Sequence, residues 1–335
     1  MTERKELLRV EHLKKYFETR RGTLSAVDDV SFSINEGETL GVVGESGCGK
    51  STLGRAILRL HEPTSGKIFF NGENILSYDK IKMKKLRSSM QIIFQDPYSS
   101  LNPRMTVSQA IAAPLIIQGI FRPKEKDEIQ KKVDEMMTLV GLAKRFANSY
   151  PHELDGGRRQ RIGIARALSL DPKFIVCDEP VSALDVSIQA QILNLMQELQ
   201  EQLGLTYLFI THDLSVVKHL SDNILVMYLG HVVELADSKK LFKNPLHPYT
   251  KALLSAIPIP DPDLSMERIL LEGEITSPIN LSIGCRFAKR CSLMRPDCLT
   301  GKIELKEIEP GHFVACNIVA SKFNSRCSIG KERWV

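Results

Sequence analysis

The chain is 335 residues long, which suits one large domain or two, and its apolar fraction of 43% is enough for a sizeable core. Its net charge is +5 and its basic residues are spread along the chain, which argues against a dedicated nucleic-acid partner. No apolar run approaches the ~18 residues of a membrane span, and the first residues lack a signal-peptide pattern, so we expect a cytoplasmic protein. In that compartment the seven cysteines favour metal binding over structural disulfides.

Apolar runs in the first hundred residues predict short strands. They lie at residues 7–10, 30–34, 40–43, 67–72 and 91–94. The run at 67–72 ends in an Asn-Gly turn signal, which is typical of a hairpin. These strands predict a sheet that continues in the second half of the chain.

The strand at 40–43 leads into GESGCGKST at residues 44–52, and a predicted helix at 53–60 follows. A strand, a glycine-rich loop and a helix are the context in which the G-x-x-x-x-G-K-[ST] motif binds phosphate through backbone N–H groups and the helix N-terminus. The predicted nucleotide-binding residues are Gly44, Ser46, Gly47, Cys48, Gly49, Lys50, Ser51 and Thr52. We expect Lys50 to reach the β and γ phosphates and the Ser51 hydroxyl to bind Mg²⁺.

Tyr16 and Phe17 fall on a polar loop upstream of this motif. An exposed aromatic ring there is a candidate for stacking on a nucleotide base. The alternative is a partly buried ring at the edge of the sheet.

The sequence that follows the first strands changes in pattern, with apolar residues at helical spacing interrupted by prolines. Helices are predicted at residues 106–119, 126–141 and 158–170. We interpret residues 97–168, approximately, as a helical insertion in an α/β domain.

Later apolar runs predict the remaining strands, at residues 174–177, 205–210, 224–228 and 231–235, the last two finishing the sheet. Because the carboxyl ends of parallel strands meet at one edge of an α/β sheet, residues that end these strands are candidate ligands. Asp178 is predicted to hold Mg²⁺ through water, and Glu179 to orient or deprotonate the attacking water. His212 is a candidate contact to the γ-phosphate, and Gln95 a candidate ligand of Mg²⁺ or water.

The sequence PHELDGGRRQR at residues 151–161 resembles the signature of the ATP-binding cassette ATPases of membrane transporters, Leu-Ser-Gly-Gly-Gln at the start of a helix. The other family elements stand in order: the phosphate loop, Gln95, the signature, residues 174–179, SALD at 182–185 and His212. The resemblance covers residues 6 to about 255. Its motifs form a specific, ordered set.

This resemblance implies an α/β fold with a P-loop NTPase (RecA-like) core, an antiparallel β subdomain and a helical subdomain, forming a nucleotide-binding domain over residues 1–256. It adds further nucleotide-binding residues, namely Asp155, Gly156, Gly157, Arg158 and Asp185. In the family the signature contacts ATP that a partner subunit holds. Chromosome and repair ATPases share these motifs, but the interval between loop and signature is too short here for their coiled coil. Ribosome-associated relatives carry two cassettes in one chain.

Two further stretches resemble the oligopeptide, dipeptide and nickel importers, FQDPYSSLNPRM at 94–105 and NPLHPYTKALL at 244–254. The resemblance implies one of two ATPase subunits, in a heterodimer or, in isolation, a homodimer. They would lie at the cytoplasmic face of the membrane beneath two permease subunits, with an extracellular peptide-binding protein. ATP would close the dimer and hydrolysis open it, driving import of di- or oligopeptides. A nickel importer, and a regulatory subunit with a weakened hydrolysis site, are the alternatives.

The signature departs from the family pattern because Asp155 replaces serine and Arg158 replaces glutamine. Aspartate caps a helix as well as serine does. A carboxylate would nevertheless repel the γ-phosphate, since two unit charges ~4 Å apart interact by about 4 kcal/mol at an effective dielectric constant of ~20. We expect Arg158 to offset this repulsion by pairing with Asp155 or with phosphate.

Cys285, Cys291, Cys298 and Cys316 follow a proline-rich boundary at 257–263, within a C-terminal cysteine-rich module over residues 257–335. Their spacing is wider than the C-x2-4-C pairs usual in zinc sites. It resembles the iron–sulfur module at the C-terminus of some peptide-importer ATPases, which implies one [4Fe–4S] cluster. Zinc and unliganded thiols are the alternatives. We expect the arginines and lysine around the cysteines to favour thiolates.

Overall fold

The computed structural model describes residues 5–257, 268–271, 273, 278–281, 283–321 and 323. The predicted proline-rich boundary lies outside the described residues from 258 onward. The chain divides into two compact units. Unit 1 comprises residues up to Arg9, Ser33–Thr39 and Ile68–Thr211, and unit 2 comprises Val10–Phe32, Leu40–Lys67 and the described residues from His212 onward.

Unit 2 contains the strand order β11-β12-β10-β9-β3. The bounds are β3 Thr39–Val43, β9 Asn223–Tyr228, β10 His231–Asp237, β11 Lys306–Glu309 and β12 His312–Val314. β3 pairs in parallel with β9, and the other neighbours pair antiparallel. Every residue of β3 is buried, as its nearly continuous apolar sequence predicts, so β3 gives the phosphate loop a fixed starting point.

The helices of unit 2 are short. They are α1 Lys50–Ile57, α8 Leu214–Leu220, α9 Ser238–Lys243, α10 Pro248–Ser255, the 3₁₀ helix η4 Ala288–Arg290, and α11 Asp297–Thr300. α1 begins at Lys50, three residues before the predicted helix, so the lysine of the motif is itself the first helical residue.

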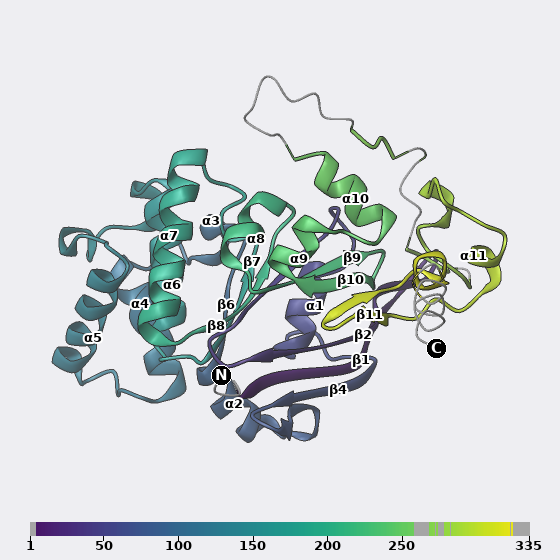
Figure 1. Ribbon diagram of the computed structural model, residues 1–335. Helices are drawn as coiled ribbons and strands as arrows, with labels where there is room; N and C mark the ends of the chain where they lie inside the picture. The colour runs from purple at the N-terminus through teal and green to yellow at the C-terminus, as the bar shows by residue number, and fades with distance from the viewer. Residues whose placement is uncertain are drawn as a thin grey trace, which may run out of the picture. The chain divides into compact units, whose positions relative to one another are not determined.

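Unit 1 contains the parallel strand order β8-β7-β6, with β6 Met90–Ile93, β7 Phe174–Asp178 and β8 Thr206–Ile210. Its helices are η1 Ile75–Ser77, α2 Lys80–Ser89, α3 Pro97–Ser100, α4 Val107–Gln118, α5 Lys126–Leu139, η2 Lys144–Phe146, η3 Pro151–Glu153, α6 Gly156–Leu168 and α7 Val186–Leu203. Helices α4, α5, α6 and α7 gather on one side of these strands (Figure 1). They include the helical insertion that the sequence indicates.

Strands β1 Glu6–Thr19, β2 Gly22–Asn35, β4 Ser65–Phe70 and β5 Glu73–Asn74 form a second sheet in the order β2-β1-β4-β5. The expected polar loop at Tyr16 and Phe17 is wrong, because both residues lie inside β1. The Tyr16 N–H donates to the Thr64 hydroxyl over 2.9 Å, and the chain turns only at Arg20 and Arg21, ahead of Gly22. β1 is hydrogen-bonded to β2 and β4, so strand pairing includes a polar segment that no apolar run marks.

The prediction that the sheet finishes at residue 235 is also wrong. β12 pairs with β10, placing Val314 beside Glu234, and β11 extends the sheet further. These two strands are short and largely polar, so apolar periodicity does not reveal them. Their hairpin turn contains Gly311 at φ 72°, in the left-handed region that suits glycine. Among the described residues, no helix is long and apolar enough to cross a membrane.

Candidate nucleotide and thiol sites

Two glycines of the phosphate loop are required by its backbone. Gly44 and Gly49 have φ angles of 152° and 106°. A Cβ on Gly44 would lie 2.2 Å from the Met227 carbonyl oxygen, and one on Gly49 would lie 2.0 Å from that of Ala26. The loop therefore presses against neighbouring backbone at both ends, which fixes its curvature.

The Lys50 side chain is buried within the loop, at 4% exposure. Its Nζ donates to the carbonyl oxygens of Gly44 at 2.8 Å and Glu45 at 3.1 Å. These bonds hold an ammonium group across the loop, where the motif places a phosphate. Ser46 and Gly47 are exposed, Cys48 is buried, and Ser51 and Thr52 lie in the first turn of α1.

In unit 1, β7 positions the two predicted acids. Asp178 ends the strand at 1% exposure, and Glu179 follows with φ 48°, an unusual value for a residue other than glycine. The Glu179 N–H donates to the Ile210 carbonyl at 2.9 Å, and Gln95 Nε2 donates to Glu179 Oε2 at 3.0 Å. The structure thus brings Gln95 and Glu179 together, at a strained position of the kind common in active sites.

His212 is exposed and follows β8. Asp185 caps α7, accepting a hydrogen bond from the Ile188 N–H at 3.0 Å. This gives Asp185 a structural task in addition to its predicted contact with nucleotide.

The signature residues form the exposed N-terminus of α6. Asp155 is the N-cap, and its Oδ1 accepts from the Arg158 N–H at 2.8 Å. Arg158 Nη1 lies 2.7 Å from Asp155 Oδ2, with side-chain exposures of 45% and 55%. A Cβ on Gly157 would lie 2.6 Å from Ile188 Cγ2, so α6 packs closely on α7 here. The expected Asp155 cap and its pairing with Arg158 are both present.

The Tyr16 hydroxyl donates to Asp28 in a hydrogen bond that the sequence did not reveal. Asp28 also contacts His231 Nε2 at 3.2 Å and Arg286 Nη2. Burial alone would raise the pKa of Asp28, but the hydrogen bonds from His231 and Tyr16 and the charge of Arg286 lower it well below its usual range. Phe17 packs edge-on against His61, with ring centroids 5.7 Å apart. Tyr16 is thus tethered at its polar end.

The four C-terminal cysteines lie near one another. Cys298 is buried with Ala288 and Ile318, and Cys285 and Cys316 pack against this cluster. The Cys285 N–H donates to the Cys298 carbonyl at 2.7 Å. Burial raises the pKa of Cys285 to about 11, and the other three thiols add to the rise. The expectation that nearby cations yield thiolates is therefore wrong for Cys285 and Cys291, because burial raises the pKa of both thiols and two of those cations pair with carboxylates.

Within the described part of the chain, no group of three or more His, Cys, Asp or Glu residues is arranged to hold a metal ion. The four thiols lie near one another without forming such a group.

Two arginines of the C-terminal module form ion pairs with distant residues of unit 2, and the sequence does not reveal either pair. Arg290 pairs with Glu45 of the phosphate loop, and Arg286 pairs with Asp28. Their local sequence signal is their position beside Cys285 and Cys291, which favours a role in stabilising thiolates over a long-range ion pair. Ion pairs between residues more than two hundred positions apart leave no recognisable pattern in the local sequence.

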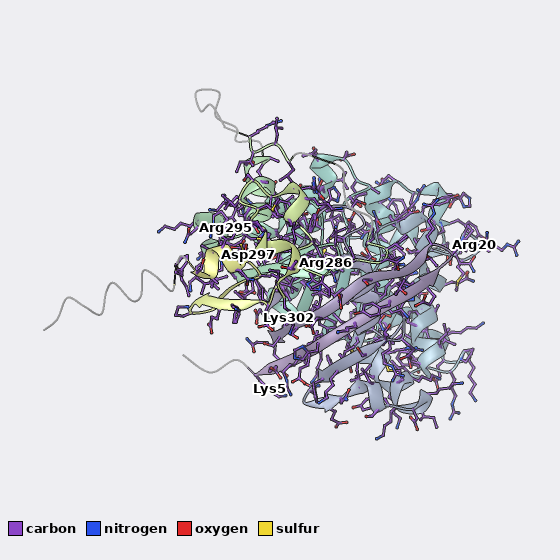
Figure 2. The ribbon with its side chains drawn as sticks, turned by 90° about the vertical axis from the view of Figure 1, so that its right-hand side faces the viewer. Lys5, Arg20, Arg286, Arg295, Asp297 and Lys302 are labelled. Atoms are coloured by element: carbon purple, nitrogen blue, oxygen red, sulfur yellow. The ribbon has the colours of Figure 1, made fainter. Side chains whose placement is uncertain are left out.

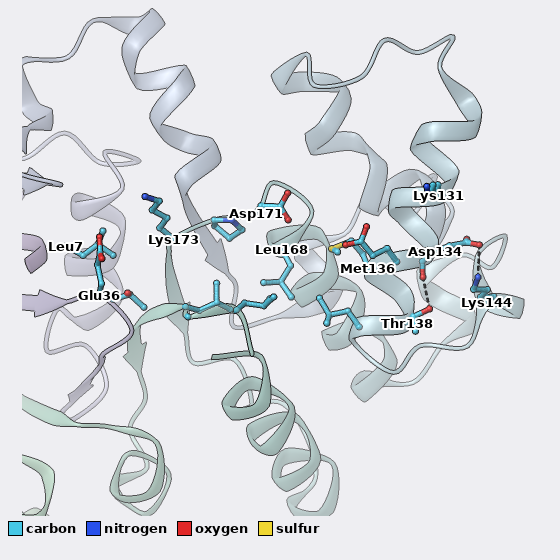
Figure 3. A pocket seen from close by; sticks show the side chains of 17 residues that line it. Leu7, Glu36, Lys131, Asp134, Met136, Thr138, Lys144, Leu168, Asp171 and Lys173 are labelled. Carbon is cyan, nitrogen blue, oxygen red and sulfur yellow. Dashed lines mark hydrogen bonds and ion pairs between the residues drawn. The ribbon is translucent and has the colours of Figure 1, made fainter. Parts of the chain in front are cut away.

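A cavity of about 1020 Å³ lies in unit 1 beside α5 and the start of β8 (Figure 3). Charged residues of both signs line it, including Lys131, Asp134, Lys144, Asp171 and Lys173. Lys144 and Asp134 pair across 3.0 Å. The predicted nucleotide-binding residues are not part of its lining, so we assign it no role in phosphate chemistry.

Comparisons with known proteins agree with these motifs. The ABC transporter family model matches residues 27–182, and the model for the oligopeptide/dipeptide transporter C-terminal region matches residues 233–298. The oligopeptide transport ATP-binding protein OppF of Bacillus subtilis (strain 168) is 55% identical over 317 residues, covering 94% of this chain and 97% of the relative. AppF, an oligopeptide transport ATP-binding protein of the same organism, is 52% identical over 322 residues, covering 93% and 97%.

Two solved structures share the fold. One is a dimeric ATP-binding cassette in a post-hydrolysis state bound to ADP and Pi, with a TM-score of 0.63, 30% identity, and coverage of 69% of this chain and 99% of that one. The other is CbiO1 from Clostridium perfringens, part of an ABC transporter complex, with a TM-score of 0.63, 32% identity, and coverage of 72% and 92%. The predicted cassette fold is therefore confirmed, whereas these likenesses do not test the thiol cluster.

Proposed function

The chain belongs to the ATP-binding cassette transporter ATPase family, and we propose that it is the ATP-hydrolysing subunit of a peptide importer. The observation that carries this proposal is the match of more than nine-tenths of the chain to oligopeptide transport ATP-binding proteins at 52% and 55% identity. The match to the C-terminal region of oligopeptide/dipeptide transporters supports a peptide as the cargo.

In the proposed reaction each motif residue has its own role. Lys50 binds the β and γ phosphates, while Ser51 and Asp178 would hold Mg²⁺, which when bound would neutralise phosphate charge. Glu179 accepts the proton of the attacking water, and Gln95 orients Glu179 through the hydrogen bond between them. His212 contacts the γ-phosphate. Most of the rate enhancement comes from such positioning and charge stabilisation.

We further propose that the signature of each subunit covers the ATP of the other, so that binding closes a dimer and loss of the γ-phosphate opens it. The partner is a second ATPase subunit, and the pair works beneath two permease subunits at the cytoplasmic face of the membrane. An extracellular binding protein delivers the peptide. Support comes from family membership and from the dimeric state of the related cassette.

We also propose that Cys285, Cys291, Cys298 and Cys316 hold a [4Fe–4S] cluster after local rearrangement. The support is the proximity of the four thiols and the resemblance in their spacing. Protein purified without oxygen should contain about four iron and four acid-labile sulfide per chain. Stoichiometric zinc without sulfide would contradict the cluster.

Transport is tested by uptake of a radiolabelled tripeptide in cells of the source strain that lack this gene. The unaltered chain should restore uptake, whereas Lys50→Ala should not, because the phosphates lose their ammonium partner. The matched control is Lys131→Ala, which changes a lysine outside the motifs and should restore uptake fully. Normal tripeptide uptake without the gene, together with lost uptake of radioactive nickel, would favour the nickel alternative.

A further inference from the structure

Residues 285–291, here called the thiol segment, contact the phosphate loop. Two local hydrogen bonds define its backbone path, since the Ala288 N–H donates to the Cys285 carbonyl at 3.0 Å and the Cys291 N–H donates to the Ala288 carbonyl at 3.2 Å. These bonds enclose η4, whose last residue is Arg290. The positions of its two arginines are therefore tied to the two cysteines that bound it.

Arg290 forms a two-pronged ion pair with Glu45 of the phosphate loop. Its Nη1 lies 2.8 Å from Glu45 Oε2, and its Nη2 lies 3.1 Å from Oε1. The Arg290 side chain is 8% exposed and that of Glu45 is 23% exposed. Because the pair is bidentate and mostly shielded from solvent, it is stronger than a typical surface salt bridge.

The same segment also supports the backbone of Glu45. The Glu45 N–H donates to the Tyr249 hydroxyl at 2.9 Å. Phe287 packs against the rings of Tyr249 and Tyr228, with centroids 5.4 Å and 5.3 Å away. Glu45 is thus held at its carboxylate by Arg290 and at its N–H by a tyrosine that Phe287 supports.

Arg286 provides a second connection. It donates to the Leu229 carbonyl and to Asp28, the carboxylate that also binds the Tyr16 hydroxyl. Figure 2 shows Arg286 on the inner side of the module and Arg295 near its outer edge. The thiol segment therefore contacts both the phosphate loop and the carboxylate that tethers a predicted base-stacking ring.

We propose that Arg290 is a positioning residue for ATP, which neutralises Glu45 and thereby lets the thiol segment set the nucleotide affinity of the phosphate loop. The proposal rests on the ATPase function proposed above. Without Arg290, the Glu45 carboxylate would repel a triphosphate bound to the loop. It would also compete for Lys50, whose ammonium group already donates to the Glu45 carbonyl oxygen. Arg290 removes both effects.

The test is equilibrium binding of AMP-PNP with Mg²⁺ to the purified full chain. Arg290→Ala should weaken binding about tenfold, equivalent to ~1.4 kcal/mol. Arg290→Lys should recover part of the loss, since it keeps the charge but not the paired geometry. The matched control Arg295→Ala, an exposed arginine of the same module, should bind as the unaltered chain does.

The double variant Arg290→Ala with Glu45→Gln separates charge from structure. It should bind within about twofold of Glu45→Gln alone, because no carboxylate remains to be neutralised. A purely structural role for Arg290 would leave the double variant weak, and that result would overturn the proposal. Equal affinities of Arg290→Ala and Arg295→Ala would overturn it as well. Failure of the unaltered chain to bind AMP-PNP would instead reject the ATPase function on which the proposal rests.

Discussion

Helices α1 and α6 both begin at a glycine-containing motif, but the charge at their N-termini differs. α1 is capped by Gly49 in a left-handed conformation, so the cap residue supplies no side-chain hydrogen bond. α6 is capped by Asp155, whose carboxylate accepts from the Arg158 N–H and pairs with its guanidinium. Because a helix N-terminus attracts anions, the first end is prepared for a phosphate, while the second already carries an anion of its own.

Two similar glycine-containing motifs can therefore form sites that differ in how far they are preorganised for nucleotide binding. The phosphate loop is set by backbone contacts at Gly44 and Gly49 and by a buried Lys50. The signature is exposed, and its charge is balanced only by a neighbouring side chain. Changes in the first should abolish binding, whereas changes in the second should adjust a rate.

Gly49→Ala should have the largest effect. Its Cβ would lie 2.0 Å from the Ala26 carbonyl oxygen at a φ of 106°, so the loop must move before any ligand binds. We expect ATP affinity to fall at least a hundredfold, equivalent to about 3 kcal/mol, in an equilibrium binding assay. Gly163→Ala in α6 is the matched control, since a Cβ there meets nothing within 4 Å. Equal affinity of the two variants would show that the loop is less constrained than its contacts indicate.

Glu179→Gln should preserve ATP binding and lower turnover at least a hundredfold, because an amide cannot accept the proton from water. The substitution keeps the size of the side chain near Gln95. Phosphate release by the chain together with its proposed second ATPase subunit measures the effect, and Glu198→Gln, on the exposed side of α7, is the control. Turnover that persists in Glu179→Gln would assign the base to another residue.

The phosphate loop was predictable because its information is contiguous. Nine residues between a buried strand and a helix specify both the backbone path and the ligand chemistry. Asp178 and Glu179 were predictable for a similar reason, since one apolar run marks the strand that they end. The Asp155 cap also follows from local rules.

Long-range partners were not predictable. Arg290 and Glu45 are 245 residues apart, and neither is unusual in its local sequence. β11 and β12 lack an apolar run, and the polar stretch around Tyr16 belongs to β1, which is paired with β2 and β4. The missed features therefore share one cause, which is that tertiary pairing determined them.

Helix α10 shows a third kind of cap, which should make stability depend on pH. His247 Nδ1 accepts from the Tyr249 N–H at 3.1 Å, so the cap requires a neutral ring. Burial lowers the His247 pKa from 6.5 to about 4, although the Glu234 carboxylate opposes the shift. Between these pH values the unfolded chain binds the proton and the folded chain does not, so the contribution is complete above pH 6.5 and is lost as pH falls toward 4.

The full loss amounts to about 3 kcal/mol of unfolding free energy. Urea unfolding of the full chain at a series of pH values measures it. His247→Asn keeps a capping side chain but removes the titration, so the stability gap between the two proteins should narrow as pH falls. A gap that stays constant from pH 7 to pH 4 would contradict the assignment.

Asp155→Ser should have the smallest effect, and it tests the comparison most directly. Because the Asp155 side chain is 55% exposed, solvent screens the repulsion toward the ~1 kcal/mol expected at ~4 Å in bulk water, and the exposed pair with Arg158 offsets part of it. We therefore expect an increase of only about fivefold in the ATPase rate of the assembled pair. Asp155→Asn removes the charge but keeps a cap, so it should give much of the same increase if repulsion is the cause. Asp79→Ser, at the N-cap of α2, makes the same exchange away from the signature and should leave the rate unchanged. If Asp155→Ser is no faster than the unaltered chain, the carboxylate at α6 does not oppose the nucleotide, and the two helix ends differ in structure alone.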